Sequence, residues 1–172
     1  LSQAAGTCEQ VYDRVFDSHG NPRFSTKSYR KVLCPCQVET ALSGPYIDAM
    51  TDIMDAKARS KLMARIKARD TKPELLLRAA LHARGFRYRL NQRNLPGSPD
   101  IVLAKWRTAI FVHGCFWHRH PDCRYATTPA TRAEFWTAKF EANVARDRRV
   151  EEALTAMGWR VGIIWECALR GR

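Results

Sequence analysis

The residues from Phe111 to Cys123, FVHGCFWHRHPDC, limit what this chain can fold into more than any other stretch. They include three histidines, two cysteines, an adjacent Phe-Trp pair and a glycine. An ordinary core does not need this mixture, whereas imidazoles and thiols ligate metals, neutral imidazoles accept protons and aromatic rings stack. Phe111 and Val112 are typical of the end of a buried strand, and the rest is typical of a loop. The stretch therefore predicts a functional loop that follows a strand.

The chain carries a net charge of +12, which is unevenly distributed. Residues 1–49 contain as many acidic as basic residues, so the whole excess lies in residues 50–172. Lysine and arginine gain free energy by releasing counterions from phosphates, so the excess indicates a nucleic-acid partner. A basic surface with no such partner is the alternative. A membrane surface is disfavoured because no predicted helix combines a basic face with an exposed apolar one.

Composition favours a soluble, cytoplasmic protein. Hydrophobic residues make up 45% of the 172 residues, enough for the core of one domain. No apolar run approaches the roughly 18 residues of a membrane span, and no signal-peptide pattern opens the chain. Without a secretory signal, and with His120 between Cys115 and Cys123, the six cysteines favour metal binding over disulfide bonds.

The chain changes character near residue 50. Residues 1–49 contain turn signals, such as Gly20-Asn21-Pro22, and no clear helix. We expect residues 1–49 to be a poorly ordered N-terminal extension of unknown role, and residues 50–172 to form the functional domain.

Residues 50–172 predict an α/β fold. Thr71 with Glu74, and Thr131 with Glu134, form capping-box patterns that begin helices. A break is expected near Asn143 because the second helix is long. The predicted elements are a helix over 71–85, strands over 86–90, 100–103 and 108–112, a helix over 131–157 and a strand over 159–165. This order predicts a mixed sheet flanked by helices.

Asp100 is a candidate ligand for a catalytic cation. It follows Pro99 at the start of a strand, where a carboxylate can share Mg²⁺ with a substrate phosphate. A turn residue is the alternative, but hairpin pairing of the next two strands would bring His113 towards Asp100. Glu74, early in the first helix, is a second candidate carboxylate, with helix capping as its alternative role.

Three ligands within nine residues, Cys115, His120 and Cys123, indicate a metal site, and Cys167 follows the last strand. A Cys₃His set is typical of structural zinc, whose closed tetrahedral site leaves no position for substrate. Such a site would tie the loop to the end of the last strand.

If zinc binds His120, then His113 and His118 remain for proton transfer. Hydrolysis of a phosphodiester needs an activated water and a neutralised phosphate. His118 as the base, His113 as a second imidazole and Mg²⁺ on Asp100 would supply these parts. The alternative is that one histidine only forms hydrogen bonds within the loop.

Phe116 and Trp117 lie between a candidate zinc ligand and His118, on a loop that we expect to be exposed. Two large aromatics are usually core residues. In a basic protein, however, an anchored aromatic pair can wedge between base pairs, and Met63 could insert from the opposite groove.

Taken together, these residues resemble the very-short-patch-repair (Vsr) mismatch endonucleases from about residue 52 to residue 172. The motifs that carry the resemblance are RSKLMARIKARDT, LPGSPDIVL, FVHGCFWHRH, PATRAEFW, NVARDRR and GWRVGIIWECALRG. The combination of HGCFWH with a distant WECALRG is specific to this family.

The resemblance implies an α/β fold like that of restriction endonucleases, with a structural zinc site. It implies Mg²⁺ on Asp100 and on the main-chain carbonyl of Val112, and His118 as the general base. It assigns supporting catalytic roles to His113 and Glu74. The implied zinc ligands are Cys115, His120, Cys123 and Cys167, and the implied DNA-intercalating residues are Phe116, Trp117 and Met63.

The function implied is that of a Mg²⁺-dependent endonuclease that nicks double-stranded DNA 5′ of the T in T:G mismatches. Such mismatches arise when 5-methylcytosine deaminates, and the nick starts very short patch repair. We expect a monomer in the bacterial cytoplasm, associated with the nucleoid through DNA. The alternatives are a zinc-containing nuclease without mismatch specificity and a non-catalytic zinc-stabilised DNA-binding module. Restriction-type nucleases carry Asp/Glu-x-Lys where this chain has Phe111-Val112-His113, and the Vsr family shares that departure.

Overall fold

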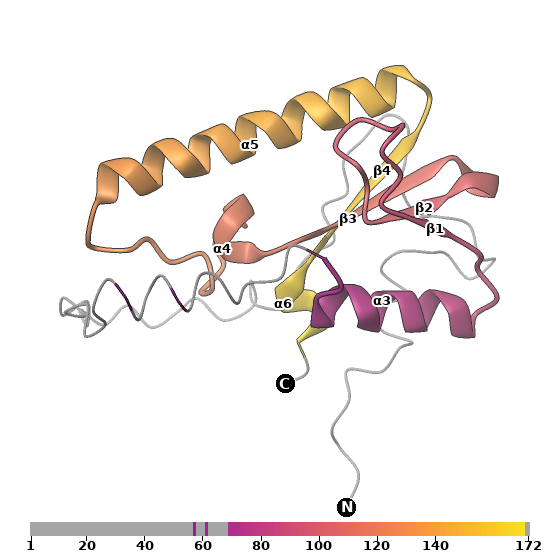
Figure 1. Cartoon of the computed structure of the whole chain (residues 1–172), viewed down its shortest axis with the longest axis horizontal. Coiled ribbons are helices and arrows are strands. Elements are labelled where there is room, and N and C mark those ends of the chain that lie inside the picture. Colours follow the sequence, from indigo (N-terminus) through magenta and orange to yellow (C-terminus); the bar gives the residue numbers. More distant parts are fainter. Residues whose placement is uncertain (1–56, 58–60, 62–68, 171–172) are drawn as a thin grey trace, which may run out of the picture.

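A four-stranded mixed sheet forms the centre of the computed structural model, which describes Lys57, Lys61 and residues 69–170 (Figure 1). The strands are β1 (Arg89–Leu90), β2 (Ile101–Leu103), β3 (Thr108–His113) and β4 (Arg160–Trp165). They lie in the order β1-β2-β3-β4, the first two pairs antiparallel and β3-β4 parallel. The predicted mixed α/β architecture is confirmed.

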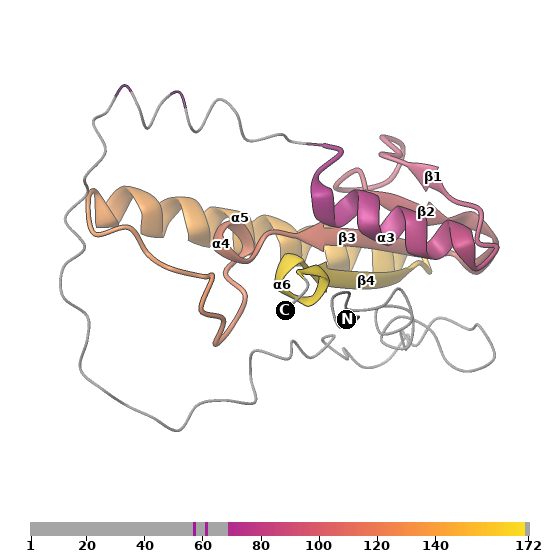
Figure 2. The same cartoon turned by 90° about the horizontal axis from the view of Figure 1, so that it is seen from below.

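Two helices cover opposite faces of this sheet, as Figures 1 and 2 show: α3 (Lys72–Ala83) and α5 (Ala133–Ala156). On the α3 side, Leu77 and Leu81 pack with alternate strand residues such as Ile110. On the α5 side, Leu154 packs with Val102 and with the intervening strand residues. Successive side chains of each strand point to opposite faces of the sheet, so both faces carry apolar residues that pack against a helix. Each buried aliphatic side chain stabilises the fold by about 1.5–3 kcal/mol.

One end of the sheet carries the residues of interest. The parallel pairing of β3 and β4 ends with His113 opposite Trp165. Each strand is followed at once by a single helical turn, α4 (Cys115–His118) after β3 and α6 (Glu166–Leu169) after β4. Parallel neighbouring strands end at the same edge, so α4 and α6 begin close together (Figure 2).

The opposite end of the sheet is held by arginine side chains. A 3₁₀ turn, η2 (Ala104–Trp106), joins β2 to β3 as the predicted hairpin connection. Arg107 follows it and donates to the carbonyls of Met157 and Gly158 at the end of α5. Arg160 of β4 donates to the carbonyl of Trp106. These bonds tie the hairpin to the α5–β4 connection.

Three predictions about local structure need correction. The predicted strand over 86–90 is confined to Arg89–Leu90, because Phe86 turns into the core and packs against Trp106. The stretch after His113 is not all loop, since α4 forms there. The long helix is unbroken at Asn143, whose side chain is accommodated by donating to the Trp117 carbonyl.

Neither capping box forms as predicted. Thr71 is the N-cap of α3, but its hydroxyl donates to Glu74 rather than capping the backbone, and Glu74 accepts the N–H of Asp70. At α5 the N-cap is Arg132, in a left-handed conformation and without a side-chain cap bond. The predicted end of α3 is confirmed, since the helix stops at Ala83 and Gly85 has a φ of +81°.

Residues 1–49 and Met63 lie outside the described residues, so the predictions for them stay open. Within the part of the chain that the structure describes, no helix is both long and apolar enough to cross a membrane.

Candidate active site and metal cluster

A cavity of about 730 Å³ lies between the start of α3, the ends of β3 and β4, the turn α4 and one side of α5. Its lining includes all of the candidate catalytic residues and the candidate carbonyl ligand: Glu74, Asp100, Val112, His113 and His118. The hairpin places Ile101 opposite Ile110, which brings Asp100 near the end of β3 as expected. Residues that are far apart in sequence therefore meet in one concave site.

Asp100 is a carboxylate whose surroundings disfavour its charge. Its Oδ2 accepts the main-chain N–H of Val112 at 2.8 Å. Burial raises the pKa of Asp100 above its ordinary value, and the nearby Glu74 raises it further against the effect of the Val112 bond. A buried carboxylate under these conditions favours a bound cation, because a cation offsets the cost of keeping it ionised.

Glu74 is buried and fully engaged in hydrogen bonds. One oxygen accepts the hydroxyl of Thr71 at 2.8 Å, and the other accepts the N–H of Asp70 and the guanidinium of Arg78. Arg78 also pairs with Asp70 at 2.5 Å. Glu74 thus lines the cavity while its hydrogen bonds hold the start of α3 together.

His113 and His118 are stacked, with ring centroids 3.8 Å apart. Burial, together with the charge of His118, lowers the pKa of His113 to about 3, so His113 is neutral near pH 7. Trp165 meets the His113 ring edge-on, with centroids 5.4 Å apart. A neutral, enclosed imidazole supports the position of its stacking partner and does not compete with it for a proton.

His118 is paired with a carboxylate from α5, Asp147. The Nδ1 of His118 lies 2.5 Å from Oδ2 of Asp147. Burial raises the pKa of Asp147, but the hydrogen bond to His118 and the nearby positive charges outweigh it and leave that pKa below its ordinary value. An ionised Asp147 accepts a hydrogen bond from the Nδ1–H of His118, which leaves Nε2 of His118 as the proton acceptor of the ring.

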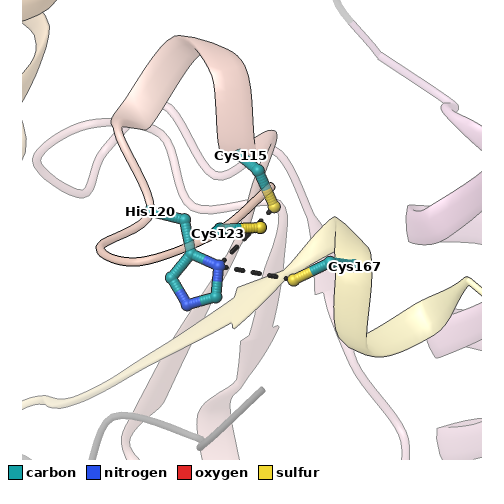
Figure 3. Close-up of side chains that lie close together, drawn as sticks. All are labelled: Cys115, His120, Cys123 and Cys167. Carbon is teal, nitrogen blue, oxygen red and sulfur yellow. Dashed lines mark hydrogen bonds between the residues drawn. The ribbon is translucent and has the colours of Figure 1, made fainter. Parts of the chain in front are cut away.

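The candidate zinc ligands Cys115, His120, Cys123 and Cys167 are all buried and converge in one cluster (Figure 3). Their ligand atoms lie within 4.8 Å of one another. His120 Nδ1 is 3.7 Å from Cys115 Sγ and 3.3 Å from Cys167 Sγ. Tetrahedral zinc, with Zn–S near 2.3 Å and Zn–N near 2.0 Å, places neighbouring ligand atoms roughly 3.5–3.8 Å apart. The four residues fit such an ion.

The protonation of Cys115 also fits a metal site. Burial raises the pKa of the Cys115 thiol to about 11. A thiolate in that position is favourable only beside a cation, which is what a metal-bound cysteine has. The His120 ring stacks on Trp165 at a centroid distance of 4.3 Å, which fixes its orientation.

The metal cluster and the cavity share a wall. Glu166, next to Cys167, lines the cavity and accepts the main-chain N–H of Cys115 at 3.2 Å. Cys115 in turn begins the turn that ends at His118. Two cluster ligands therefore fix both ends of the contact between α4 and α6.

Known proteins match this chain over the same region. A family model described as DNA mismatch endonuclease Vsr matches residues 51–125. The DNA mismatch endonuclease Vsr of Escherichia coli is 50% identical over 123 residues, covering 72% of this chain and 78% of that protein. The type II nicking enzyme V.XorIIP of Xanthomonas oryzae is 48% identical over 120 residues, covering 70% of this chain and 88% of the enzyme. The chain belongs to the Vsr family.

A further Vsr relative is the type II nicking enzyme V.NmeAIP of Neisseria meningitidis, 42% identical over 123 residues. That match covers 72% of this chain and 87% of the relative. The resemblance found in the sequence motifs is therefore confirmed at the level of the family.

The aromatic pair of this Vsr-family chain lies differently from the prediction. Phe116 and Trp117 are on α4, half-buried, and not on an exposed loop. Phe116 packs edge-on against Trp136 and Phe140 of α5, at centroid distances of 5.7 and 5.2 Å. Lys139 lies over the Trp117 ring at 5.4 Å. The pair thus belongs to an aromatic cluster with cationic neighbours, and Met63 lies outside the described residues.

Sequence reasoning missed Asp147, which lies in the charged run Arg146-Asp147-Arg148-Arg149, a pattern typical of a solvated helix face. A signal was present, because Asp147 lies at helical spacing between Asn143 and Val150, on the side of α5 that faces the protein. A charged residue on the side of a helix that faces the protein needs a hydrogen-bonding or ionic partner, and His118 is that partner for Asp147.

Proposed function

We propose that this protein nicks double-stranded DNA 5′ of the T in T:G mismatches and so initiates very short patch repair. The broader assignment, a Vsr-like nicking endonuclease that acts on DNA, rests on family membership. The observation that carries the proposal is the convergence of Asp100 and the His118–Asp147 pair on one cavity. The sheet between two helices, with Asp100 at the start of β2, further supports a restriction-endonuclease-like fold.

In this proposal His118 acts as the general base. Its Nε2 takes a proton from water, the water oxygen bonds to phosphorus, and the bond from phosphorus to the departing sugar oxygen breaks, that oxygen taking a proton from a solvent water. Asp147 orients the ring through Nδ1 and stabilises the imidazolium that forms. His113, neutral and stacked on His118, holds the ring in place.

Asp100 and the main-chain carbonyl of Val112 would hold Mg²⁺, with Glu74 supporting the site. When bound there, the cation neutralises charge on the phosphate. The raised pKa of Asp100 supports this assignment, since the carboxylate needs a positive partner to stay ionised.

Zinc, held by Cys115, His120, Cys123 and Cys167, is proposed as structural, because four protein ligands close a tetrahedral site. Phe116 and Trp117 are proposed to wedge into DNA beside the mismatch, together with Met63. Their half-buried position against α5 supports an anchored wedge, since a residue that unstacks base pairs needs a rigid base.

The test uses duplexes labelled on either strand, with a T:G mismatch or fully paired, in the presence of Mg²⁺. The wild type is expected to make a single nick on the T strand 5′ of the T. Asp100→Ala and His118→Ala should bind the duplex and leave it intact. Equal nicking of paired DNA would exclude mismatch specificity, and binding without nicking by the wild type would indicate a DNA-binding module.

A further inference from the structure

The two sides of the catalytic cavity come from different parts of the chain. Asp100 follows a loop over residues 94–99, whereas Asp147 lies on α5 and holds His118. Both sides line the same cavity. For the reaction, the distance across the cavity has to be held, because a misplacement of about 1 Å can lower a rate 100-fold.

At the cavity itself, these two sides are joined by a close contact between Gly97 in the loop and Val150 on α5. Both residues line the cavity. Gly97 has a φ of +70°, and a Cβ added there would lie 2.4 Å from Cγ1 of Val150, 3.0 Å from Cγ2 and 3.3 Å from Cβ. The loop backbone therefore rests on the Val150 side chain with no room for even a methyl group.

The contact is also rigid on both sides. In the loop, the N–H of Ser98 donates to the carbonyl of Leu95, which is buried against Leu154 of α5. On the helix, valine is restricted to one strongly preferred rotamer. Rotation about the Cα–Cβ bond of Val150 would not relieve the contact, because both methyl groups and Cβ of Val150 all lie close to the position of a Cβ added at Gly97.

Val150 lies one helical turn after Asp147, on the same side of α5. A shift of the loop against Val150 would therefore change the separation between Asp100 and the His118–Asp147 pair. We infer that the Gly97–Val150 contact sets the distance across the catalytic cavity and that Val150 is a positioning residue for DNA nicking. This inference rests on the proposed function.

The chain offers a compensating pair of substitutions as a test. Gly97→Ala inserts a Cβ that forces the loop and α5 apart by about 1 Å, since carbon atoms approach to roughly 3.5–4.0 Å. Val150→Ala removes both methyl groups and leaves only the 3.3 Å contact to Cβ, which small shifts relieve. The single-turnover nicking rate at saturating enzyme separates such an effect from DNA binding.

We expect Gly97→Ala to lower this rate about 10- to 100-fold, and Val150→Ala to lower it by less than about 10-fold. The double variant should nick at least about 10-fold faster than Gly97→Ala, with DNA affinity unchanged throughout. Val150→Ala, which lowers the nicking rate of the wild type, would thus raise the nicking rate of the Gly97→Ala protein. A merely structural role would lower the melting temperature without this pattern in the rate.

Gly85→Ala is the matched control for backbone strain. Gly85 has a φ of +81°, and within the described part of the chain no heavy atom lies within 4 Å of an added Cβ. This variant carries the same left-handed penalty without a clash, so it should lower the melting temperature and keep the wild-type rate. A wild-type rate for Gly97→Ala, or no rescue in the double variant, would overturn the inference.

The inference can fail separately from the proposed function. The rates are compared on whichever duplex the wild type nicks, so the loss of T:G specificity leaves this comparison intact. A second measurement uses Mn²⁺ as a probe, because a paramagnetic ion broadens nearby imidazole NMR signals steeply with distance. Broadening of the His118 signals should change in Gly97→Ala and return in the double variant, and identical broadening in all variants would contradict the inference.

Discussion

At the scale of single residues, the catalytic cavity depends on unequal environments for similar groups. His113 and His118 have the same side chain, but burial keeps His113 neutral while Asp147 engages His118. Asp100 and Asp147 also share a side chain, yet burial raises the pKa of Asp100 whereas the bond to His118 lowers that of Asp147. Environment, rather than residue type, sets the charge of these groups, which supports the proposed division between cation binding and proton transfer.

The pairing of His118 with Asp147 predicts the effect of Asp147→Asn. The amide keeps the shape of the carboxylate but does not stabilise an imidazolium, and it can hold the ring in the wrong tautomer. The single-turnover nicking rate should fall about 10²- to 10⁴-fold while DNA affinity changes little. Glu152→Gln, an exposed change of the same kind on α5, serves as the control. Equal rates for the two variants would show that Asp147 is not part of proton transfer.

At the scale of elements, two single-turn helices connect the metal cluster to the cavity. The α4 turn starts with the cluster ligand Cys115 and ends with His118, and α6 contains Cys167 directly after Glu166. The bond from the Cys115 N–H to Glu166 joins the two turns. Helices this short are not stable alone, so a metal ion bound by these residues would help to hold them in place.

This dependence predicts a double effect of Cys167→Ser. The variant should bind less zinc, melt at a lower temperature and nick more slowly even with excess Mg²⁺, because α4 loses its anchor. Removal of zinc from the wild type with a chelator should abolish nicking in the same way. Ala168→Ser, on the same turn, is the control. An unchanged zinc content in Cys167→Ser, measured by elemental analysis, would exclude Cys167 as a ligand.

The order of elements was predictable from the sequence, because alternating apolar residues and turn signals are local. The convergence of Asp100, His113 and His118 was predictable from strand pairing and from the family motifs. The partner of His118 was not, because Asp147 reaches it across 29 residues through the packing of α5. Likewise, the break expected at Asn143 did not occur, since a tertiary bond to Trp117 accommodates that side chain within an unbroken helix.

At the scale of the whole molecule, the two ends of the sheet differ. One end is held by hydrogen bonds of arginine side chains, and the other carries the ionisable residues of the cavity. Arginine side chains from the hairpin and β4 bind main-chain carbonyls at the first end. At the other end, buried ionisable groups line a cavity of about 730 Å³. Concentrating charge at one end costs stability there, and the packed layers elsewhere offset that cost.

This division predicts that Asp100→Asn stabilises the metal-free protein while abolishing nicking. A raised folded-state pKa means that Asp100 favours folding below its unfolded pKa of about 3.9, and that this stability is lost as pH rises through the folded pKa. At pH 7 the ionised carboxylate therefore opposes folding. The asparagine oxygen can still accept the Val112 N–H, so the melting temperature of this variant should rise by a few degrees, about 1 kcal/mol being roughly 2–4 °C for a chain of this length.

Thermal unfolding at pH 7 in a Mg²⁺ chelator that leaves zinc bound measures this gain. The difference between wild type and Asp100→Asn should shrink as the pH is lowered through the raised pKa of Asp100, because protonation removes its charge, and it should also shrink in excess Mg²⁺. A lower melting temperature for Asp100→Asn at pH 7 would show that the carboxylate stabilises the fold.

Trp165 ends β4 between the two groups of functional residues. Its indole stacks on His120 of the metal cluster and meets His113 of the cavity edge-on. Indole fluorescence responds to neighbouring imidazole rings, so a single side chain reports on both groups from inside the protein. In a variant whose other four tryptophans are replaced, the emission of Trp165 should therefore show whether the cluster and the cavity are assembled at the same time.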